Sequence, residues 1–198
     1  MADPQAVEAL KSALRRLPGV GPKSAQRMAF HLLRRDRDGA RQIGEAIDRA
    51  LSKINHCERC NNFSEAARCP ICASAKRDAS QLCIVETPAD LQAIEQAGVY
   101  QGMYFVLMGH LSPLDDIGPS QLGIDRLLAL TRADAIAEVI IATNLTVEGQ
   151  ATADFIIDLM QPTGIQVTRL ARGMPMGGEL EYMDSGTLNQ AFSDRREV

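Results

Sequence analysis

The stretch AEVIIATNLTVEG (residues 137–149) decides the fold of the larger part of the chain. It is a short apolar run that ends in a polar loop. Three further strand-like runs are LCIVE (82–86), MYFVLM (103–108) and GIQVTRLA (164–171). Helical segments lie between the runs, near residues 88–97, 121–133 and 149–161. Strands that alternate with helices of this length predict an α/β fold with a parallel sheet and helices on both of its faces.

The loops after these strands are where functional residues are expected. In open parallel sheets, ligands bind beyond the carboxyl ends of the strands. In this chain those ends carry Glu86, the loop GHLSPLDDIGP (109–119) and the segment TNLTVEG (143–149).

The N-terminal third has a helical pattern instead. We expect a first helix over residues 4–16 with Asp3 as its N-cap, and a second helix that Pro22 opens. A third helix should run to about Asn55. Its apolar residues recur at helical spacing and predict a buried stripe of Ile43, Ile47, Ala50, Leu51 and Ile54.

The turn between the first two helices, LPGVGPKSAQRM (17–28), is a candidate phosphate site. Gly19 and Gly21 let the backbone approach a ligand closely. The amides at the start of the second helix can hold a phosphate, and Lys23 and Arg27 share one face of that helix. A Walker A loop is excluded because a helix precedes the turn and Pro22 interrupts the motif. A helix–helix turn without a ligand remains the alternative.

Two CxxC pairs predict a metal site. Cys57, Cys60, Cys69 and Cys72 leave eight residues between the pairs. Four thiolates complete the tetrahedral shell of Zn²⁺, and a shell without an open position is structural. Disulfides are the weaker alternative because the N-terminus lacks the apolar region of an export signal. Cys83 stands apart in a predicted strand, where we expect it to pack in the core.

Composition and charge disfavour some classes of protein, such as membrane-spanning proteins, and favour others. The longest apolar run, Met103 to Met108, is much shorter than the roughly 20 residues of a membrane span. The absence of tryptophan and the shortage of aromatic residues disfavour a module that binds by stacking. The net charge of −4 divides unevenly: residues 1–80 hold 15 Lys and Arg against 9 Asp and Glu, and residues 81–198 hold 6 against 16. A basic first part could attract a polyanion, although charge varies between domains without a function.

The pattern around LPGVGPKSAQRM resembles the helix–hairpin–helix of DNA repair proteins. That resemblance implies that Gly19, Gly21, Lys23 and Arg27 contact the DNA backbone without reading bases. One hairpin touches few phosphates, and this chain has one copy. We therefore expect several chains to assemble into an oligomer that binds with useful affinity.

The segment IATNLTVEGQATA (141–153) resembles the second signature of Toprim domains, T-D-x-D-x-E-G. Glu86 matches the family's first-strand glutamate and Glu148 its second, but the two aspartates fall on Asn144 and Thr146. The family's carboxylates hold Mg²⁺, so the neutral replacements predict a fold retained without strand-cleaving chemistry. Two alternatives remain open. The two glutamates could be ordinary loop carboxylates, or they could form a residual Mg²⁺ site with Asp115 or Asp116.

The order of hairpin, four-cysteine knuckle, Toprim-like domain and short tail resembles the RecR family of bacterial recombination mediators. Further matching stretches are LSPLDDIGP (111–119), TNLTVEGQATA (143–153) and GGELEYMDSGTL (177–188). The resemblance implies a helix–hairpin–helix region at 1–55, a zinc finger at 56–79, a Toprim-like α/β domain at 80–173 and an oligomer-forming tail at 174–198. We expect the tail, from Arg172 on, to be irregular.

The same resemblance implies a non-enzymatic DNA clamp without catalytic residues. It would form a ring-like homotetramer in the cytoplasm, at the nucleoid and not at a membrane. RecO and RecF would be its partners in loading RecA onto gapped DNA, with Glu86, Asn144, Thr146 and Glu148 on a partner-binding or relict acidic face. The alternatives are a Mg²⁺-dependent nuclease or topoisomerase and a pure protein-interaction module.

Overall fold

A computed structural model of the chain describes residues 3–171, 174, 177–193 and 195. The chain forms two compact units, residues 1–54 and 55–198.

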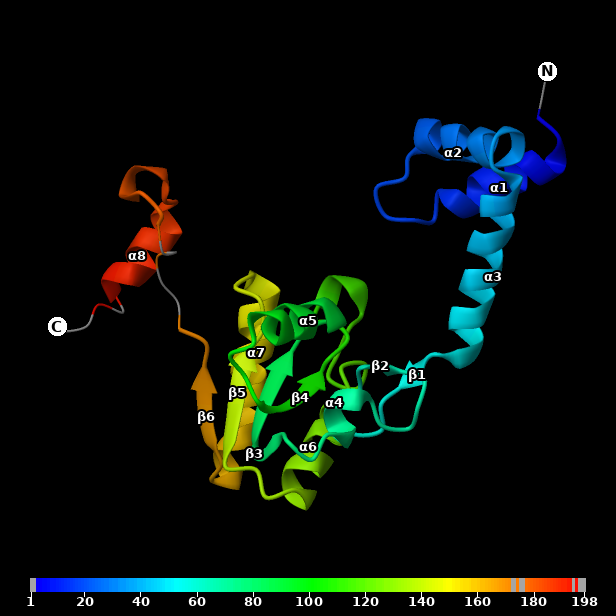
Figure 1. Cartoon of the computed structure of the whole chain (residues 1–198). Coiled ribbons are helices and arrows are strands. Elements are labelled where there is room, and N and C mark those ends of the chain that lie inside the picture. The colour runs from blue at the N-terminus through cyan, green and yellow to red at the C-terminus, as the bar shows by residue number, and fades with distance from the viewer. Residues whose placement is uncertain (1–2, 172–173, 175–176, 194, 196–198) are drawn as a thin grey trace. The chain divides into compact units, whose positions relative to one another are not determined.

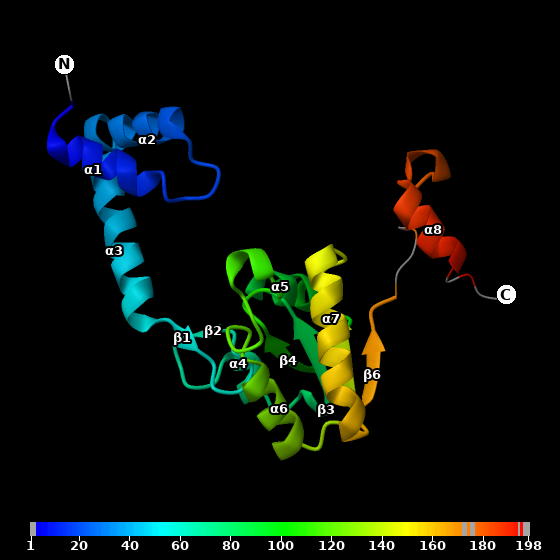
Figure 2. The same cartoon turned by 180° about the vertical axis from the view of Figure 1, so that it is seen from behind.

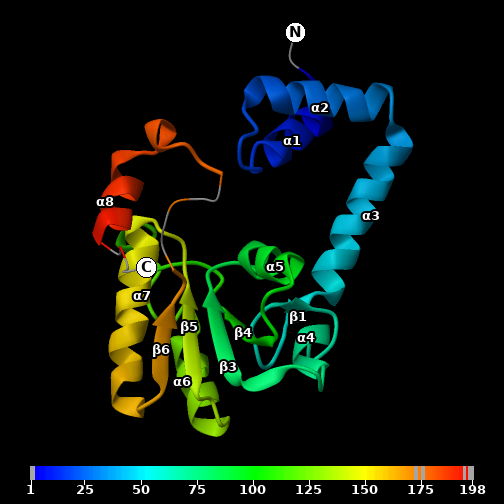
Figure 3. The ribbon, with the colours of Figure 1, turned by 60° about the vertical axis from the view of Figure 1, so that its left-hand side comes forward.

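The first unit consists of three helices, with α1 and α2 packed against each other and α3 continuing from α2 (Figure 3). Their bounds are α1 Gln5–Leu14, α2 Pro22–Arg34 and α3 Arg37–Lys53. Pro22 is the first residue of α2, as predicted, and Gly21 is the N-cap. Proline is favoured at the first position because the first amide of a helix has no intrahelical acceptor. The side chain of Asp36 caps α3 by accepting a hydrogen bond from the Gly39 amide at 2.8 Å.

Two expectations for the first unit are wrong. Asp3 does not cap α1, whose N-cap is Pro4; its carboxylate instead accepts a hydrogen bond from Lys11 at 3.0 Å. The stripe on α3 is not buried: the exposed fraction is 54% for Ile47 and 79% for Leu51. The apolar spacing is that of a packed helix, but none of the residues of α3 is buried.

The second unit begins with a small metal-binding region. Strands β1 (Asn55–His56) and β2 (Phe63–Ser64) pair in antiparallel fashion, and the short helix α4 (Pro70–Ala73) follows. The four cysteines sit in the loops and the short helix of this region, which has few apolar side chains of its own.

A four-stranded parallel sheet makes up the centre of the second unit (Figure 1). The strands lie in the order β4–β3–β5–β6. Their bounds are β3 Asp78–Val85, β4 Gly102–Val106, β5 Glu138–Ala142 and β6 Gln166–Arg169. The parallel α/β fold predicted from the sequence is therefore confirmed.

Helices cover both faces of the sheet, with α5 on one face and α6 and α7 on the other (Figure 2). Alternate residues of β3 explain this layering: Leu82 and Ile84 enter the core under α6 and α7, whereas Cys83 and Val85 enter the core under α5. The helices are α5 Pro88–Ala97, α6 Ile124–Ala133 and α7 Val147–Met160, and short 3-10 turns are η1 Pro113–Asp115 and η2 Gln161–Thr163.

The C-terminal segment contains a 3-10 turn, η3 (Leu180–Tyr182), and a helix, α8 (Ser185–Ser193). The expectation of an irregular tail is therefore wrong for residues 185–193, and Arg172 lies outside the described residues. The signal for α8 is Asp184, whose carboxylate accepts a hydrogen bond from the Thr187 amide at 2.9 Å. Among the helices of the described residues, none has the length and apolar character needed to cross a bilayer.

Candidate functional site

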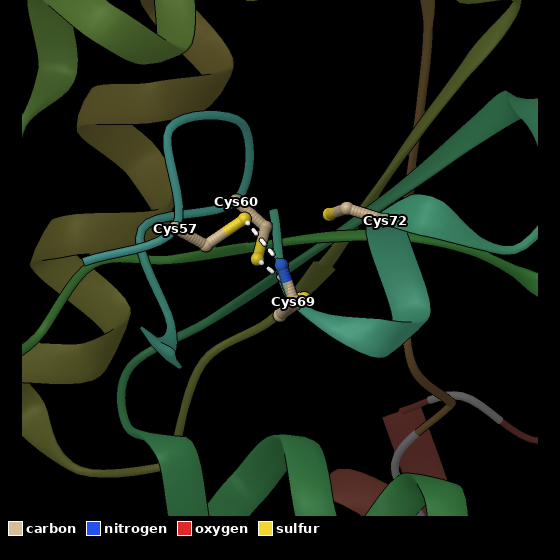
Figure 4. A group of neighbouring side chains, drawn as sticks. All are labelled: Cys57, Cys60, Cys69 and Cys72. Carbon is tan, nitrogen blue, oxygen red and sulfur yellow. Dashed lines mark hydrogen bonds between the residues drawn. The ribbon is translucent and has the colours of Figure 1, made fainter. Parts of the chain in front are cut away.

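The four cysteines predicted to bind metal converge on one point (Figure 4). Cys57 and Cys60 lie in the loop between β1 and β2, Cys69 precedes α4, and Cys72 lies in that helix. All four are buried, and their sulfur atoms lie within 4.8 Å of one another. Four buried thiols at this spacing fit the tetrahedral shell of a structural zinc ion and leave no position for a substrate.

Hydrogen bonds within the cluster lower the pKa of two of its thiols, Cys57 and Cys72. The pKa of Cys72 is lowered to about 6, chiefly because Cys60 donates a hydrogen bond to its sulfur. The same bond and burial raise the pKa of Cys60. Zinc binds thiolates, so metal binding must release the remaining protons.

Hydrogen bonds made by Asn61 and Arg126 connect the cysteine region to strand β4 and helix α6. The Asn61 side chain donates to the carbonyl of Val106, at the end of β4, at 2.7 Å, and the Val106 amide donates to the carbonyl of Cys60 at 2.8 Å. Arg126 of α6 donates to Asn61 Oδ1 at 2.6 Å and to the Cys57 carbonyl at 3.0 Å. The metal-binding region is therefore part of the α/β unit.

The candidate DNA-binding residues lie on the turn between α1 and α2 and on the N-terminal part of α2. Gly19 has a φ of +76°, in the left-handed region that favours glycine. Apart from the glycine itself and the residues adjacent to it in sequence, no atom of the described chain lies within 4 Å of the position that a Cβ would take at Gly19 or Gly21, so the turn is open to a ligand. Lys23 and Arg27 of α2 are exposed, and neither forms an ion pair with the described residues.

The Toprim-like edge is organised around a buried carboxylate. Glu86 follows β3 directly and is only 2% exposed. Its Oε1 accepts a hydrogen bond from the Asn144 backbone amide at 2.7 Å, and its Oε2 accepts one from Asn144 Nδ2 at 2.9 Å. His110 Nδ1 lies 3.4 Å from Oε2. Each carboxylate oxygen thus accepts one hydrogen bond from Asn144.

The other two residues of the predicted acidic face are placed differently. Thr146 is the N-cap of α7 and accepts a hydrogen bond from the Gly149 amide at 3.0 Å. Glu148 is exposed in the first turn of that helix. In the described part of the chain, the cysteines are the one group of three or more potential metal-ligating side chains. The structure therefore brings Glu86 and Asn144 together without gathering a set of carboxylates.

Three residues that contribute to these sites were not predicted from the sequence. His110 had a signal, since it lies in the loop after β4, where functional residues were expected. Asn61 also had one, because it lies between the cysteine pairs and adopts a φ of +64°, which asparagine tolerates. Arg126 gave no signal, because a single arginine on a predicted helix is most often solvated.

Family models match most of the length of the chain. The matches are the RecR helix-hairpin-helix at residues 7–51, the RecR zinc finger domain with four cysteine ligands at 54–74, the Toprim domain at 80–171 and the RecR C-terminal region at 173–196. The predicted structural zinc site is thereby confirmed, since the matched four-cysteine finger contains the four clustered cysteines.

A full-length relative gives the same result. The chain is 57% identical over 198 residues to "Recombination protein RecR" of Chromobacterium violaceum, a comparison that covers 100% of both proteins.

Proposed function

The chain belongs to the RecR family of recombination proteins, and on that premise we propose that it is a non-enzymatic DNA clamp and adaptor in recombinational repair. It holds DNA through the backbone and acts with RecO and RecF to help load RecA onto gapped DNA. Its place of action is the cytoplasm, at the nucleoid. The binding region is assigned to residues 1–55, the zinc finger to 56–79, the Toprim-like adaptor domain to 80–173 and the oligomer-forming tail to 174–198.

The observation that carries DNA binding is the open hairpin. Gly19 and Gly21 leave free space at the turn, and Lys23 and Arg27 present charges that no carboxylate of the described residues neutralises. The N-terminus of α2 adds backbone amides that favour an anion. These groups recognise phosphates, so binding should show little sequence preference and fall steeply with salt.

The double variant K23A/R27A tests this assignment by fluorescence anisotropy with labelled DNA of several sequences. Loss of two phosphate contacts should weaken binding to all of them alike and reduce the salt slope by about two. The matched control is R41A/R49A, which removes the same charge from α3. An equal loss of DNA affinity in both variants, or unchanged DNA binding by K23A/R27A, would show that the hairpin does not hold the DNA.

The absence of cleavage chemistry is supported by the Toprim-like edge. Asn144 and Thr146 stand where the family signature has aspartates, and Thr146 is used as a helix cap. We expect supercoiled plasmid to stay intact when it is incubated with the protein and Mg²⁺. Nicking that E86Q abolishes would support the enzyme alternative instead.

Assembly into a ring-like tetramer is supported by apolar side chains that the single chain leaves exposed. They occur on α3 and in the C-terminal segment, and they include Ile43, Ile47, Leu51, Leu180 and Phe192. Such side chains commonly mark protein interfaces. Light scattering should give a mass of four chains; a monomer at every concentration, with and without DNA, contradicts this proposal.

A further inference from the structure

We propose that Asn144 and His110 take the place of a divalent cation at Glu86 and so close the Toprim site of this chain to Mg²⁺. The three residues, called here the Glu86 bracket, join the chain segments that follow β3, β4 and β5. The proposal concerns the same edge as the absence of cleavage but does not depend on DNA binding.

The first support is the use of the carboxylate itself. A Mg²⁺ site needs one or two carboxylates with lone pairs free to face the ion. Glu86 is buried, and each of its oxygens accepts a hydrogen bond from Asn144, at 2.7 and 2.9 Å. The amide nitrogen that faces Oε2 is a donor and cannot ligate a metal. A buried carboxylate needs such partners, and here protein groups supply them.

The second support is the close fit of α7 against the bracket. A Cβ on Gly149 would lie 2.2 Å from the Asn144 carbonyl oxygen and 2.6 Å from Glu86 Oε1. Only a glycine lets the first turn of the helix approach these two groups. The glycine of the E-G pair therefore serves the packing of the bracket and needs no metal to explain it.

The third support is the loop after β4. The Gly109 amide donates to the backbone carbonyl of Glu86 at 2.9 Å, and His110 Nδ1 lies 3.4 Å from the carboxylate. The Leu111 amide then donates to Thr152 of α7 at 2.9 Å. These contacts together position the loop that begins at residue 109 beside Glu86.

The direct test is a titration of the zinc-loaded, full-length protein with Mg²⁺ at constant ionic strength. Isothermal titration calorimetry measures the binding heat, and thermal melting measures the effect of Mg²⁺ on stability. We expect no stoichiometric binding heat and no Mg²⁺-dependent change in melting temperature. The same titration of E86Q is the comparison. Stoichiometric binding by the parent chain that E86Q abolishes would overturn the proposal.

The converse test restores the family's acids with N144D/T146D. Removing the Asn144 side-chain donor and adding negative charge beside Glu86 should lower the melting temperature without Mg²⁺ and create Mg²⁺ binding that raises it again. The control Q101D/Q161D adds the same charge at exposed positions of the same unit and should gain no binding.

A folded N144D/T146D that still binds no Mg²⁺ contradicts the claim that the Asn144 amide closes the site. If this variant does not fold, the titration of the parent chain decides alone. Neither result touches the hairpin, whose failure would appear as unchanged DNA binding in K23A/R27A.

Discussion

The cysteine cluster and the Glu86 bracket both contain residues that commonly ligate metals, yet only the cysteine cluster has the geometry of a metal site. The cysteine cluster has four buried sulfur atoms within 4.8 Å, which together form a complete shell for zinc. The bracket has one buried carboxylate whose two oxygens both accept hydrogen bonds from Asn144.

The difference shows that ligand type alone does not make a metal site. Thiolates at the cysteine cluster repel one another unless a cation neutralises them, so the metal supplies folding free energy. At the bracket, one negative charge is balanced by N–H donors that the fold itself provides. One region therefore depends on a metal for its stability, and the other does not.

The largest effect is expected for Cys60→Ser. Apparent zinc-binding free energies of about 10–16 kcal/mol contribute to folding in small Cys-rich domains. Loss of one thiolate should therefore leave residues 55–74 unfolded and the protein prone to aggregation, measured by zinc content and thermal melting. Cys83→Ser makes the same exchange at a buried cysteine outside the cluster and should retain zinc. A Cys60→Ser protein that melts like its parent would mean that the cluster does not support the fold.

Gly149→Ala should disrupt the packing of α7 against the Glu86 bracket and lower the free energy of unfolding. The new Cβ would overlap the Asn144 carbonyl, and such overpacking costs about 1–3 kcal/mol. Urea unfolding measures the loss. Gly44→Ala is the matched control, since no atom lies within 4 Å of its Cβ position inside α3, and a helical alanine should stabilise by about 0.5–1 kcal/mol. Equal stability of the two variants argues against the close fit of α7.

The connection between the cysteine region and the sheet is tested by Arg126→Ala. This change removes the guanidinium that donates to Asn61 and to the Cys57 carbonyl, at an expected cost of about 1–3 kcal/mol. Faster zinc release to a chelator is the second expected result. Arg132→Ala, at an exposed position of the same helix, should leave both measurements unchanged. A protein whose zinc release is insensitive to Arg126→Ala would show that the two regions are independent.

A smaller, pH-dependent effect is expected for Arg77→Ala. Arg77 pairs with Glu95 of α5, and this pairing holds the pKa of that carboxyl below its ordinary value of 4.5. A lowered pKa contributes stability above the ordinary carboxyl pKa, and this contribution is lost as the pH falls through the folded value. The variant should lose about 1 kcal/mol at neutral pH and less in acid. A loss that does not change with pH would assign the effect to packing.

The sequence was most informative where spacing alone determines structure. The two CxxC pairs predicted one metal cluster because the geometry of a tetrahedral zinc ion fixes where its ligands lie. Strand-like runs predicted the sheet, and Pro22 predicted the start of α2 because proline suits the first turn of a helix.

Other features depend on contacts that spacing does not contain. The apolar stripe of α3 has the pattern of a buried face, but pattern does not say whether the covering residues belong to the same chain. Asn144 and Thr146 were recognised as neutral replacements, yet their tasks became visible only when Asn144 was seen to donate to Glu86 and Thr146 to cap α7. Asp3 was expected to act as a cap, and the competing partner was Lys11, eight residues away.

This chain holds zinc at the cysteine cluster and, as we propose, no divalent cation at Glu86. The most direct measurement is electron paramagnetic resonance of Mn²⁺ as the zinc-loaded protein is added, with E86Q measured in parallel. We expect the signal of free Mn²⁺ to change equally little for both proteins. A stoichiometric loss of that signal with the parent chain, absent with E86Q, would contradict the claim.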